Sequence, residues 1–370
     1  MKKKLSVFTL SLGSGGTEKF ISLMLPKLVY DYEVYLVLVH NIRHFEIPQN
    51  VKIVVLNSDR NLNIFEKIVS FPIIIKKYIL FLSSNNIDIS LSLLTRPNII
   101  NSFVKFFHKN IKVILSERCY PSIAYKSSRF RFYLYKLLIP FFYNKADAVF
   151  SNSLHINNDL LKNFGVHKPM NLIYNPITLF PVEEITKDNK QFDIVWIGKL
   201  VDIKNPMMLL RAIKESNRFY NVQILGTGNL EAVLESISPD NIYFRGNVSN
   251  VFEYIKQSKC LVLTSNSEGF PNVILEGMSY GLPIIATNCT SGPLEILNDN
   301  KEIDISPGDF KVVKFGILVN VDDSSGLAKA INKLFTDQEL YSKLANLSYS
   351  RAKDFTIENS YNELRRILIK

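Results

Sequence analysis

Short runs rich in β-branched and other apolar residues alternate along the chain with longer segments of helical composition. This alternation is typical of parallel sheets whose strands are joined by crossover helices. In the first half, the predicted strands are residues 5–10, 34–39, 52–56, 89–93, 112–116 and 148–151. In the second half, they are residues 193–197, 222–225, 242–245, 260–264, 283–286 and 316–319. The pattern predicts an α/β fold.

The length of the chain and one polar segment predict where it divides. Its 370 residues exceed what a single hydrophobic core usually covers, so two domains are expected. Asn175-Pro176 precedes a polar stretch without a strand pattern. The predicted parts are an N-terminal domain (1–180), a linker (181–191), a C-terminal domain (192–355) and a final helix packing back on the first domain (356–370). Two Rossmann-like parallel-sheet domains facing a cleft are the simplest arrangement, with ligands at the carboxyl ends of the strands.

Positive charge is concentrated in the first half of the chain. The formal net charge is +10. Residues 1–185 have 23 Lys and Arg against 12 Asp and Glu, whereas residues 186–370 have 21 against 22. The first half is therefore expected to face an anionic partner.

Cysteine spacing and hydropathy favour a cytoplasmic location. Cys119, Cys260 and Cys289 lie far apart without metal-ligand spacing, which suits a reducing compartment. The N-terminal apolar run is short and lacks a cleavage site, so it predicts a first strand rather than a signal peptide. No uninterrupted apolar stretch reaches the roughly 18 residues that a membrane-spanning helix needs.

The stretch from Glu268 to Glu276, with sequence Glu-Gly-Phe-Pro-Asn-Val-Ile-Leu-Glu, is the strongest candidate for a binding site. It follows a predicted strand, and its proline predicts a helix that starts at Pro271. The N–H groups at such a helix end bind anions such as phosphate. A carboxylate before the helix and another about one turn inside it are placed to accept hydrogen bonds from sugar hydroxyls. The pattern predicts a nucleotide-sugar site.

Two lysines follow the predicted strand 193–197. Lys199 and Lys204 are spaced to offset the charge of a leaving diphosphate as point charges, without a metal. The alternative is that both are solvated surface lysines. The sequence has no D-x-D motif or His/Asp cluster that predicts a Mg²⁺ or Mn²⁺ site. We therefore expect no metal.

Glycine-rich turns follow several predicted strands. Glycines let a backbone approach a phosphate closely, and a helix that follows can direct its N-terminus at the anion. The alternative for the first of these turns is a tight connection without a ligand. The glycines concerned are Gly15, Gly16, Gly198, Gly226 and Gly228.

Taken together, these motifs resemble the GT4 family of glycosyltransferases, which have the GT-B fold. The similarity rests on the Gly15-Gly16 loop, a G-K-L-x-x-x-K-N segment, a G-x-G turn and an E-x7-E motif, in this order along the chain. The family commonly has Arg at the position of Lys199, so bidentate recognition is lost there while the charge is kept.

The resemblance implies a role for each matching residue. Lys199 and Lys204 would contact the donor diphosphate, Glu268 the donor sugar and Glu276 the ribose hydroxyls. The Gly15-Gly16 loop would lie at the cleft floor. Backbone contacts to sugar and phosphate are implied for Phe270, Pro271, Asn272 and Val273. Such enzymes retain the anomeric configuration, need no metal or other cofactor, and are thought to use the leaving phosphate as acceptor of the proton.

One position departs from the family pattern. Many relatives have histidine in a Ser-Glu-His segment after the fifth strand, whereas this chain has Ser116-Glu117-Arg118. Glu117 is a candidate for orienting the acceptor or the donor sugar, but no histidine can act beside it. The substitution favours one alternative, a sugar-binding module that has lost catalysis.

The segment from Arg118 to Ala146 contains no acidic residue and is rich in aromatic residues. Basic and aromatic residues on a partly apolar helix are typical of a segment that lies on anionic lipid headgroups. The alternative is a buried helix with solvated lysines. A nucleic-acid groove is disfavoured because it explains neither the Glu268 motif nor the nearly neutral second half. The basic residues proposed to face the membrane are Lys126, Arg129, Arg131, Lys136 and Lys145.

These expectations define a retaining, metal-independent glycosyltransferase that is peripheral on the inner face of the cytoplasmic membrane. It is expected to move a hexose or N-acetylhexosamine, with N-acetylgalactosamine favoured, from a UDP-sugar to a polyprenyl-diphosphate-linked glycan. Its segments Leu10–Gly16 and Arg96–Asn98 resemble bacterial N-acetylgalactosaminyltransferases that act on such glycans. A UDP-sugar 2-epimerase of the same architecture is the enzymatic alternative; it would need no acceptor.

Overall fold

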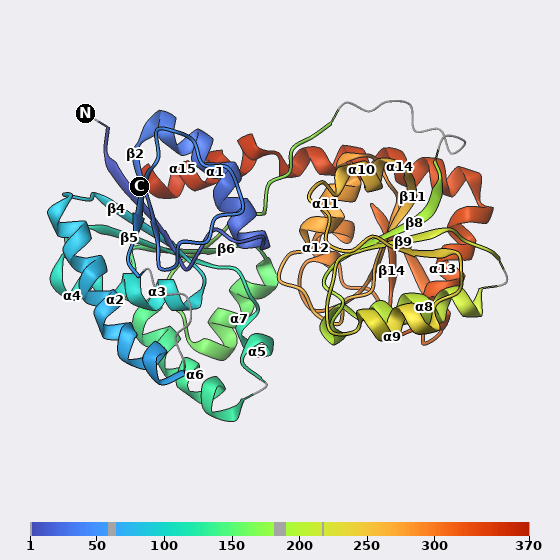
Figure 1. The fold of residues 1–370 in the computed structure, drawn as a ribbon, viewed down its shortest axis with the longest axis horizontal. Coiled ribbons are helices and arrows are strands. Elements are labelled where there is room, and N and C mark those ends of the chain that lie inside the picture. The colour runs from blue at the N-terminus through green and yellow to red at the C-terminus, as the bar shows by residue number, and fades with distance from the viewer. Residues whose placement is uncertain (1, 58–63, 127, 181–189, 217, 370) are drawn as a thin grey trace. The chain divides into compact units, whose positions relative to one another are not determined.

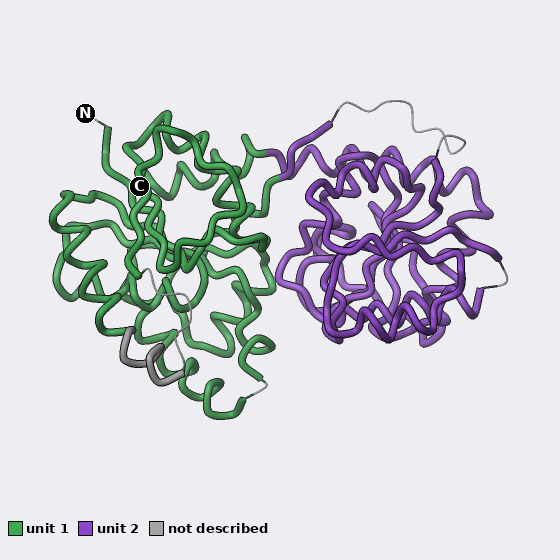
Figure 2. The backbone as a smooth tube through the Cα atoms, viewed as in Figure 1, with its two compact units in different colours: residues 1–176, 357–370 green, residues 177–356 purple. Residues whose placement is uncertain are grey.

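A computed structural model describes residues 2–57, 64–126, 128–180, 190–216 and 218–369, with only the backbone described for 64–70 (Figure 1). The chain forms two compact units. The first consists of Met1–Pro176 and Ile357–Lys370, and the second of Ile177–Thr356 (Figure 2). Most of the predicted linker, 181–191, lies outside the described residues.

The first unit is built on a seven-stranded sheet in the order β3-β2-β1-β4-β5-β6-β7. Every neighbouring pair is parallel. The central strands are buried on both faces, as expected for a sheet covered by helices on each side. The strands are β1 (Lys4–Thr9), β2 (Glu33–Leu38), β3 (Lys52–Val55), β4 (Ile89–Leu93), β5 (Lys112–Glu117), β6 (Ala148–Ser151) and β7 (Met170–Leu172).

Helices cover both faces of this sheet and create two hydrophobic cores (Figure 1). One core includes apolar residues of α1 and α15, and the other those of α2, α3, α6 and α7. The last helix of the chain is therefore part of the first unit. The helices are α1 (Gly16–Asp31), α2 (Ile64–Ser84), α3 (Thr95–Ser102), α4 (Val104–Phe107), α5 (Pro121–Ala124), α6 (Arg129–Tyr143), α7 (Leu154–Phe164) and α15 (Ile357–Ile369).

The second unit has its own seven-stranded sheet, in the order β10-β9-β8-β11-β12-β14-β13. All of its pairs are parallel except β13 with β14. The strands are β8 (Phe192–Ile197), β9 (Val222–Leu225), β10 (Ile242–Phe244), β11 (Ser258–Leu263), β12 (Ile284–Thr287), β13 (Phe310–Val313) and β14 (Gly316–Val319). The sequence pattern misses one edge strand in each unit, β7 and β13.

Helices also cover the second sheet, with Trp196 fully buried in the core beneath α8 and α13. Among the described residues, no helix is both long and apolar enough to cross a membrane. The helices of this unit are α8 (Pro206–Glu215), α9 (Glu231–Ile237), α10 (Phe252–Lys256), α11 (Asn272–Ser279), α12 (Pro293–Asn298), α13 (Ser324–Thr336) and α14 (Gln338–Ala352), with 3₁₀ turns η2 (Asp202–Lys204) and η3 (Lys353–Phe355).

Candidate active site

The carboxyl ends of β9, β8 and β11, which are neighbours in the second sheet, bring several predicted site residues to one edge. Gly198 and Lys199 follow β8, Gly226 follows β9 and Glu268 lies in the loop after β11. Ligands of open parallel sheets bind at this edge because the loops that leave neighbouring strands converge there. The fold therefore gathers residues that are up to 70 positions apart in the sequence.

Lys204 and Glu268 form an ion pair at this edge. The Lys204 Nζ lies 2.5 Å from the Glu268 Oε1, and the Ser265 hydroxyl donates to the same oxygen at 2.6 Å. The Glu268 side chain is 8% exposed and that of Lys204 is 29% exposed. An ion pair with so little solvent is screened much less than a surface pair, so the two charges constrain each other. The sequence predicted both residues for the site but not their direct contact.

Hydrogen bonds from buried groups fix the position of Lys204. Its carbonyl accepts from the Thr264 hydroxyl at 2.9 Å, and Trp196 Nε1 donates to that hydroxyl oxygen at 2.9 Å. The next residue, Asn205, has a left-handed backbone (φ 45°) and caps α8 by accepting from the Met208 N–H at 3.2 Å. This cap sets the direction in which the chain leaves Lys204.

Two of the predicted glycines are required by the packing of these loops. A Cβ added at Gly226 would lie 1.9 Å from the Gly198 carbonyl oxygen, and one at Gly228 would lie 2.2 Å from that of Leu200. Gly226 also has a positive φ of 128°, which L side chains rarely adopt. The loops after β8 and β9 therefore touch backbone to backbone, and their glycines have a structural reason that is independent of any ligand. Lys199, on the first of these loops, is exposed.

The helix of the Glu268 motif begins one residue later than predicted. Pro271 is the N-cap, with φ −76° and an extended ψ of 101°, so the first helical residue of α11 is Asn272. No side chain caps this helix start. Phe270 is buried before the helix, and Glu276, one turn inside, is only 7% exposed. Val273 is half-buried.

In the first unit, the carboxylate of Glu117 is enclosed by hydrogen-bond donors. Its Oε2 accepts from the hydroxyls of Tyr143 at 2.6 Å and Thr95 at 2.9 Å. Its Oε1 accepts from the backbone N–H of Arg118 at 3.0 Å and from the Cys119 thiol at 3.1 Å. Glu117 has no exposed surface. A substrate contact would require the side chain to leave these donors, so its role in orienting a sugar stays a prediction.

Arg118, the residue at which this segment departs from the expected family pattern, is buried against the rings of Phe20 and Phe150. Its Nε donates to the Ser116 hydroxyl at 2.7 Å, and its Nη1 donates to the Asn175 Oδ1 at 2.8 Å. Its guanidinium carbon lies 3.7 Å from the centroid of the Phe20 ring. Burial lowers the pKa of Arg118 to about 9, although the nearby Glu117 opposes this shift. These contacts tie the loop after β5 to α1 and to Asn175, the residue before Pro176 at the end of the first segment of this unit.

Gly15 and Gly16 lie at the start of α1. Gly15 is its N-cap and makes no side-chain cap, and Gly16 is its first residue. A Cβ at Gly15 would meet only the end of the flexible Glu18 side chain, at 2.4 Å. Steric packing therefore does not require glycine at position 15, unlike at positions 226 and 228. The predicted contact of this loop with a ligand remains a prediction.

A known family model matches the part of the chain that forms most of the second unit. Residues 191–337, which include every predicted site residue of the second unit, match the family model described as "Glycosyl transferases group 1". These residues form a group 1 glycosyl transferase domain. The resemblance seen in the sequence is therefore confirmed, and the protein is a glycosyltransferase.

Two bacterial relatives match the glycosyltransferase over almost its whole length. Both are from Campylobacter jejuni subsp. jejuni serotype O:2. One is N-acetylgalactosamine-N,N'-diacetylbacillosaminyl-diphospho-undecaprenol 4-alpha-N-acetylgalactosaminyltransferase, 28% identical over 95% of this chain and 96% of the relative. The other is GalNAc-alpha-(1->4)-GalNAc-alpha-(1->3)-diNAcBac-PP-undecaprenol alpha-1,4-N-acetyl-D-galactosaminyltransferase, 27% identical over 99% of this chain and 98% of the relative.

Solved structures confirm the predicted fold class. Sucrose-phosphate synthase from Thermosynechococcus elongatus matches with a TM-score of 0.78 and 15% identity, over 100% of this chain and 98% of that one. Anabaena Alr3699/HepE in complex with UDP matches with a TM-score of 0.76 and 15% identity, over 99% of both chains. At this identity the likeness shows the fold alone, which is GT-B.

Several residues that hold the candidate site residues of each unit in place were not predicted from the sequence. Thr264 fixes the Lys204 backbone, whereas Thr95 and Tyr143 enclose Glu117. Thr95 and Tyr143 lie 22 and 26 positions from Glu117 in the sequence, so no local motif predicts their hydrogen bonds to Glu117. Among the residues that the structure describes, no group of three or more His, Cys, Asp or Glu side chains is arranged to hold a metal.

Proposed function

We propose that this protein is a retaining GT4 glycosyltransferase that transfers a hexose or N-acetylhexosamine from a UDP-sugar to a polyprenyl-diphosphate-linked oligosaccharide. N-acetylgalactosamine is the favoured sugar, and the product is a bacterial N-glycan, O-antigen or capsule. The observation that carries the proposal is the Lys204–Glu268 ion pair before the N-terminus of α11, within the group 1 glycosyl transferase domain.

Each part of this arrangement has a role in the proposed reaction. The α11 N-terminus and the ammonium groups of Lys199 and Lys204 stabilise the negative charge that develops on the leaving diphosphate. Glu268 accepts a hydrogen bond from a hydroxyl of the donor sugar, and Glu276 from the ribose. Because Lys204 already contacts Glu268 at 2.5 Å, sugar and phosphate are bound by a preformed pair. Preformed charges cost no reorganisation when the glycosidic bond breaks.

The proposed acceptor follows from the relatives. The names of both Campylobacter jejuni enzymes give an undecaprenol-linked substrate and an alpha N-acetylgalactosaminyl product. An alpha product formed from an alpha-linked UDP-sugar corresponds to retention. This chain spans nearly the full length of both relatives, so its acceptor is proposed to be of the same chemical class.

A panel of UDP-sugars offered with a lipid-extracted acceptor tests the proposal. One UDP-sugar, UDP-N-acetylgalactosamine first, is expected to give a lipid-linked product whose mass increases by one sugar residue, with an alpha linkage by NMR. The rate is expected to be unchanged by EDTA, because lysines and a helix N-terminus stabilise the diphosphate. A strict metal requirement would contradict the lysine-based site. Conversion of the UDP-sugar without an acceptor would identify an epimerase, and binding without turnover a sugar-binding module.

The exposed surface of α6 supports a peripheral position on the inner face of the cytoplasmic membrane. Large apolar side chains one helical turn apart form a solvent-exposed stripe along it, and basic side chains flank that stripe. A helix of this kind binds at the boundary of headgroups and acyl chains. The stripe consists of Phe130 (76% exposed), Tyr133 (64%), Leu134 (38%), Leu137 (73%) and Phe141 (55%). The flanking basic residues on the helix are Arg129, Arg131 and Lys136, with Lys126 and Lys145 beyond its ends.

Charge reversal on α6 is expected to release the protein from anionic vesicles. Each basic residue near an anionic surface contributes about 1 kcal/mol to binding, so replacing Arg129, Arg131 and Lys136 by Glu should weaken it more than 100-fold. Sedimentation with vesicles of phosphatidylcholine and phosphatidylglycerol measures the change. The matched control is the triple Lys→Glu variant at exposed positions of the second unit, Lys214, Lys329 and Lys343. Equal binding by the α6 variant and wild type would refute the membrane assignment.

A further inference from the structure

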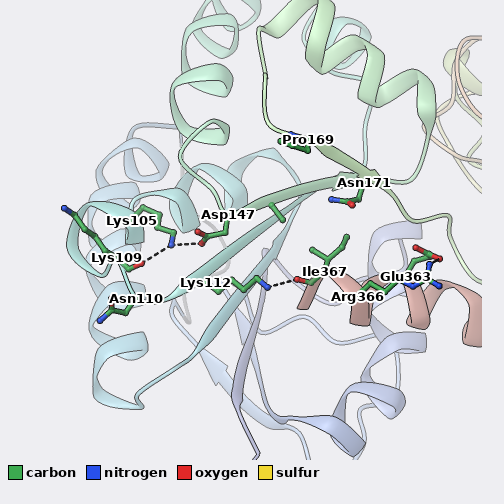
Figure 3. A pocket seen from close by; sticks show the side chains of 11 residues that line it. Lys105, Lys109, Asn110, Lys112, Asp147, Pro169, Asn171, Glu363, Arg366 and Ile367 are labelled. Carbon is green, nitrogen blue, oxygen red and sulfur yellow. Dashed lines mark hydrogen bonds and ion pairs between the residues drawn. The ribbon is translucent and has the colours of Figure 1, made fainter. Parts of the chain in front are cut away.

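A basic cavity of about 620 Å³ lies at the amino ends of β5, β6 and β7 in the first unit (Figure 3). The side chains that matter here come from the α4 region, the start of β5, the residue before β6 and the end of α15. They are Lys105, Lys109, Lys112, Asp147, Glu363 and Arg366. Strand β5 begins with Lys112 and ends with Glu117. The basic cavity is therefore at the opposite edge of the sheet from Glu117 and is separate from the proposed transfer site.

The charges lining the basic cavity do not balance. Its lining has four cationic side chains and two carboxylates, and both carboxylates are already paired. Lys105 Nζ lies 2.5 Å from the Asp147 Oδ2, and Arg366 Nη1 lies 2.5 Å from the Glu363 Oε1. Figure 3 shows Lys105 and Asp147 directed toward each other and the exposed Lys109 side chain extending outward from the rim. Within the part of the chain that the structure describes, the ammonium groups of Lys109 and Lys112 form no ion pair with a carboxylate.

Lys112 is the partly buried one of these two lysines. Its ammonium donates to the carbonyl oxygens of Ile367 at 2.7 Å and Leu368 at 3.2 Å, at the end of α15. These acceptors are neutral. Burial lowers the pKa of Lys112, with the nearby Asp147 opposing this shift and Lys3 adding to it. A bound anion would stabilise its charged form. The cavity wall therefore contains a cation whose charge is only partly compensated by the protein.

We propose that the basic cavity binds a phosphate group. A phosphate group carries one negative charge as a diester and up to two as a monoester, so it offsets part or all of the charge of two cations. Arg366 can give it the parallel N–H donors that guanidinium groups offer to phosphate oxygens. The volume of about 620 Å³ is larger than a phosphate ion needs, so the group is part of a larger molecule.

The surface next to the basic cavity favours a phospholipid headgroup as the source of the phosphate. Lys105 is followed on α4 by Phe106 and Phe107, which are 47% and 66% exposed. Phe106 lies 6.2 Å from Phe141 of α6, ring centroid to centroid, and the Lys145 ammonium lies about 5 Å from both rings. Exposed aromatic rings beside a basic cavity suit the boundary between headgroups and acyl chains. The alternative source is a soluble phosphate.

Titration calorimetry with monomeric short-chain lipids tests the proposal without a bilayer surface, to which α6 is proposed to bind. Dihexanoyl phosphatidylglycerol is expected to bind saturably, whereas dihexanoyl phosphatidylcholine is not, because its headgroup has no net charge. The variant with Lys109→Glu and Arg366→Gln should bind phosphatidylglycerol at least tenfold more weakly. Both side chains are exposed, so the variant should keep the melting temperature of wild type. The control is Lys76→Glu, an exposed lysine of α2 that does not line the cavity; it should bind like wild type.

Inorganic phosphate is the second probe. Phosphate binding as tight as that of phosphatidylglycerol, and lost in the double variant, would keep the site but overturn the lipid assignment. Equal binding of either probe by wild type and the double variant, or no saturable binding of both, would overturn the site itself. The readout is binding to the full chain, so the result does not depend on whether the protein transfers a sugar.

Discussion

Glu268→Gln is expected to slow sugar transfer about 10²–10³-fold, the effect of removing one preorganised electrostatic group from an active site. Glutamine keeps the shape of the side chain but removes the charge that Lys204 contacts at 2.5 Å. The donor sugar then loses a charged hydrogen-bond acceptor, and the Lys204 ammonium loses its partner. Initial rates of UDP release, with the lipid-linked product counted by mass spectrometry, measure the change. The effect should fall mainly on kcat.

A double-mutant cycle separates the ion pair from the two individual roles. Lys204→Met should also slow transfer about 10²-fold or more, because the leaving diphosphate loses a point charge. Residues that act as a unit are non-additive, so the double variant should be little slower than the slower single variant. Full additivity would show that the contact at 2.5 Å has no role in transfer.

The same unit contains a matched control for this cycle. Lys259 Nζ lies 2.9 Å from the Asp193 Oδ1, and the two side chains are 25% and 18% exposed. This pair joins β11 and β8 near their amino ends, at the opposite edge of the sheet from Glu268. Lys259→Met should lower the free energy of unfolding about as much as Lys204→Met does, but it should leave kcat unchanged. Normal transfer by Glu268→Gln would contradict the site assignment. Slow transfer by Lys259→Met would contradict it as well.

The periodicity of the sequence predicted the central strands because these are buried on both faces. Runs such as those in β2 and β12 are mostly apolar, as is typical of a strand between two helical layers. Of the edge strands, β3 and β10 were predicted, whereas β7 and β13 were not. Residues 170–172 and 310–313 are short and partly exposed, so burial leaves only a weak pattern in their sequence.

Features of the candidate site that depend on residues close together in the sequence could be predicted. Contacts between residues far apart in the sequence were missed. The order of Glu268, Pro271 and Glu276 along the chain indicated a loop, a helix start and a carboxylate one turn inside, and the helix begins within one residue of the predicted position. The enclosure of Glu117 depends on Thr95 and Tyr143, which the fold brings together from separate helices. Predicting such a contact requires the helix packing, which periodicity alone does not give.

The glycines of the second unit show the same limit. The sequence indicated close approach of a backbone to a phosphate at Gly226, yet the backbone that approaches it is that of Gly198. A positive φ and a carbonyl oxygen of the protein both demand glycine there, whether or not a ligand binds. Glycine at a strand end is therefore ambiguous in sequence between ligand contact and loop packing.

Gly226→Ala is expected to destabilise the second unit by about 2–5 kcal/mol. The added Cβ would lie 1.9 Å from the Gly198 carbonyl oxygen, a backbone atom that moves only if the loop after β8 moves. A left-handed backbone costs an L residue about 1–2 kcal/mol, and overpacking adds about 1–3 kcal/mol. Urea unfolding followed by the fluorescence of Trp196, which is fully buried in this unit, measures the loss.

Gly246→Ala is the control that isolates the steric term. Gly246 also has a positive φ, 64°, but a Cβ there would meet nothing within 4 Å. Gly246→Ala should therefore lower the free energy of unfolding only by the cost of a left-handed backbone, about 1–2 kcal/mol. Any relief of the Gly226 clash would displace the loop of Gly198 and Lys199, so Gly226→Ala should also slow transfer at temperatures where it stays folded. Equal destabilisation by the two variants would show that the contact between the loops after β8 and β9 does not constrain the site.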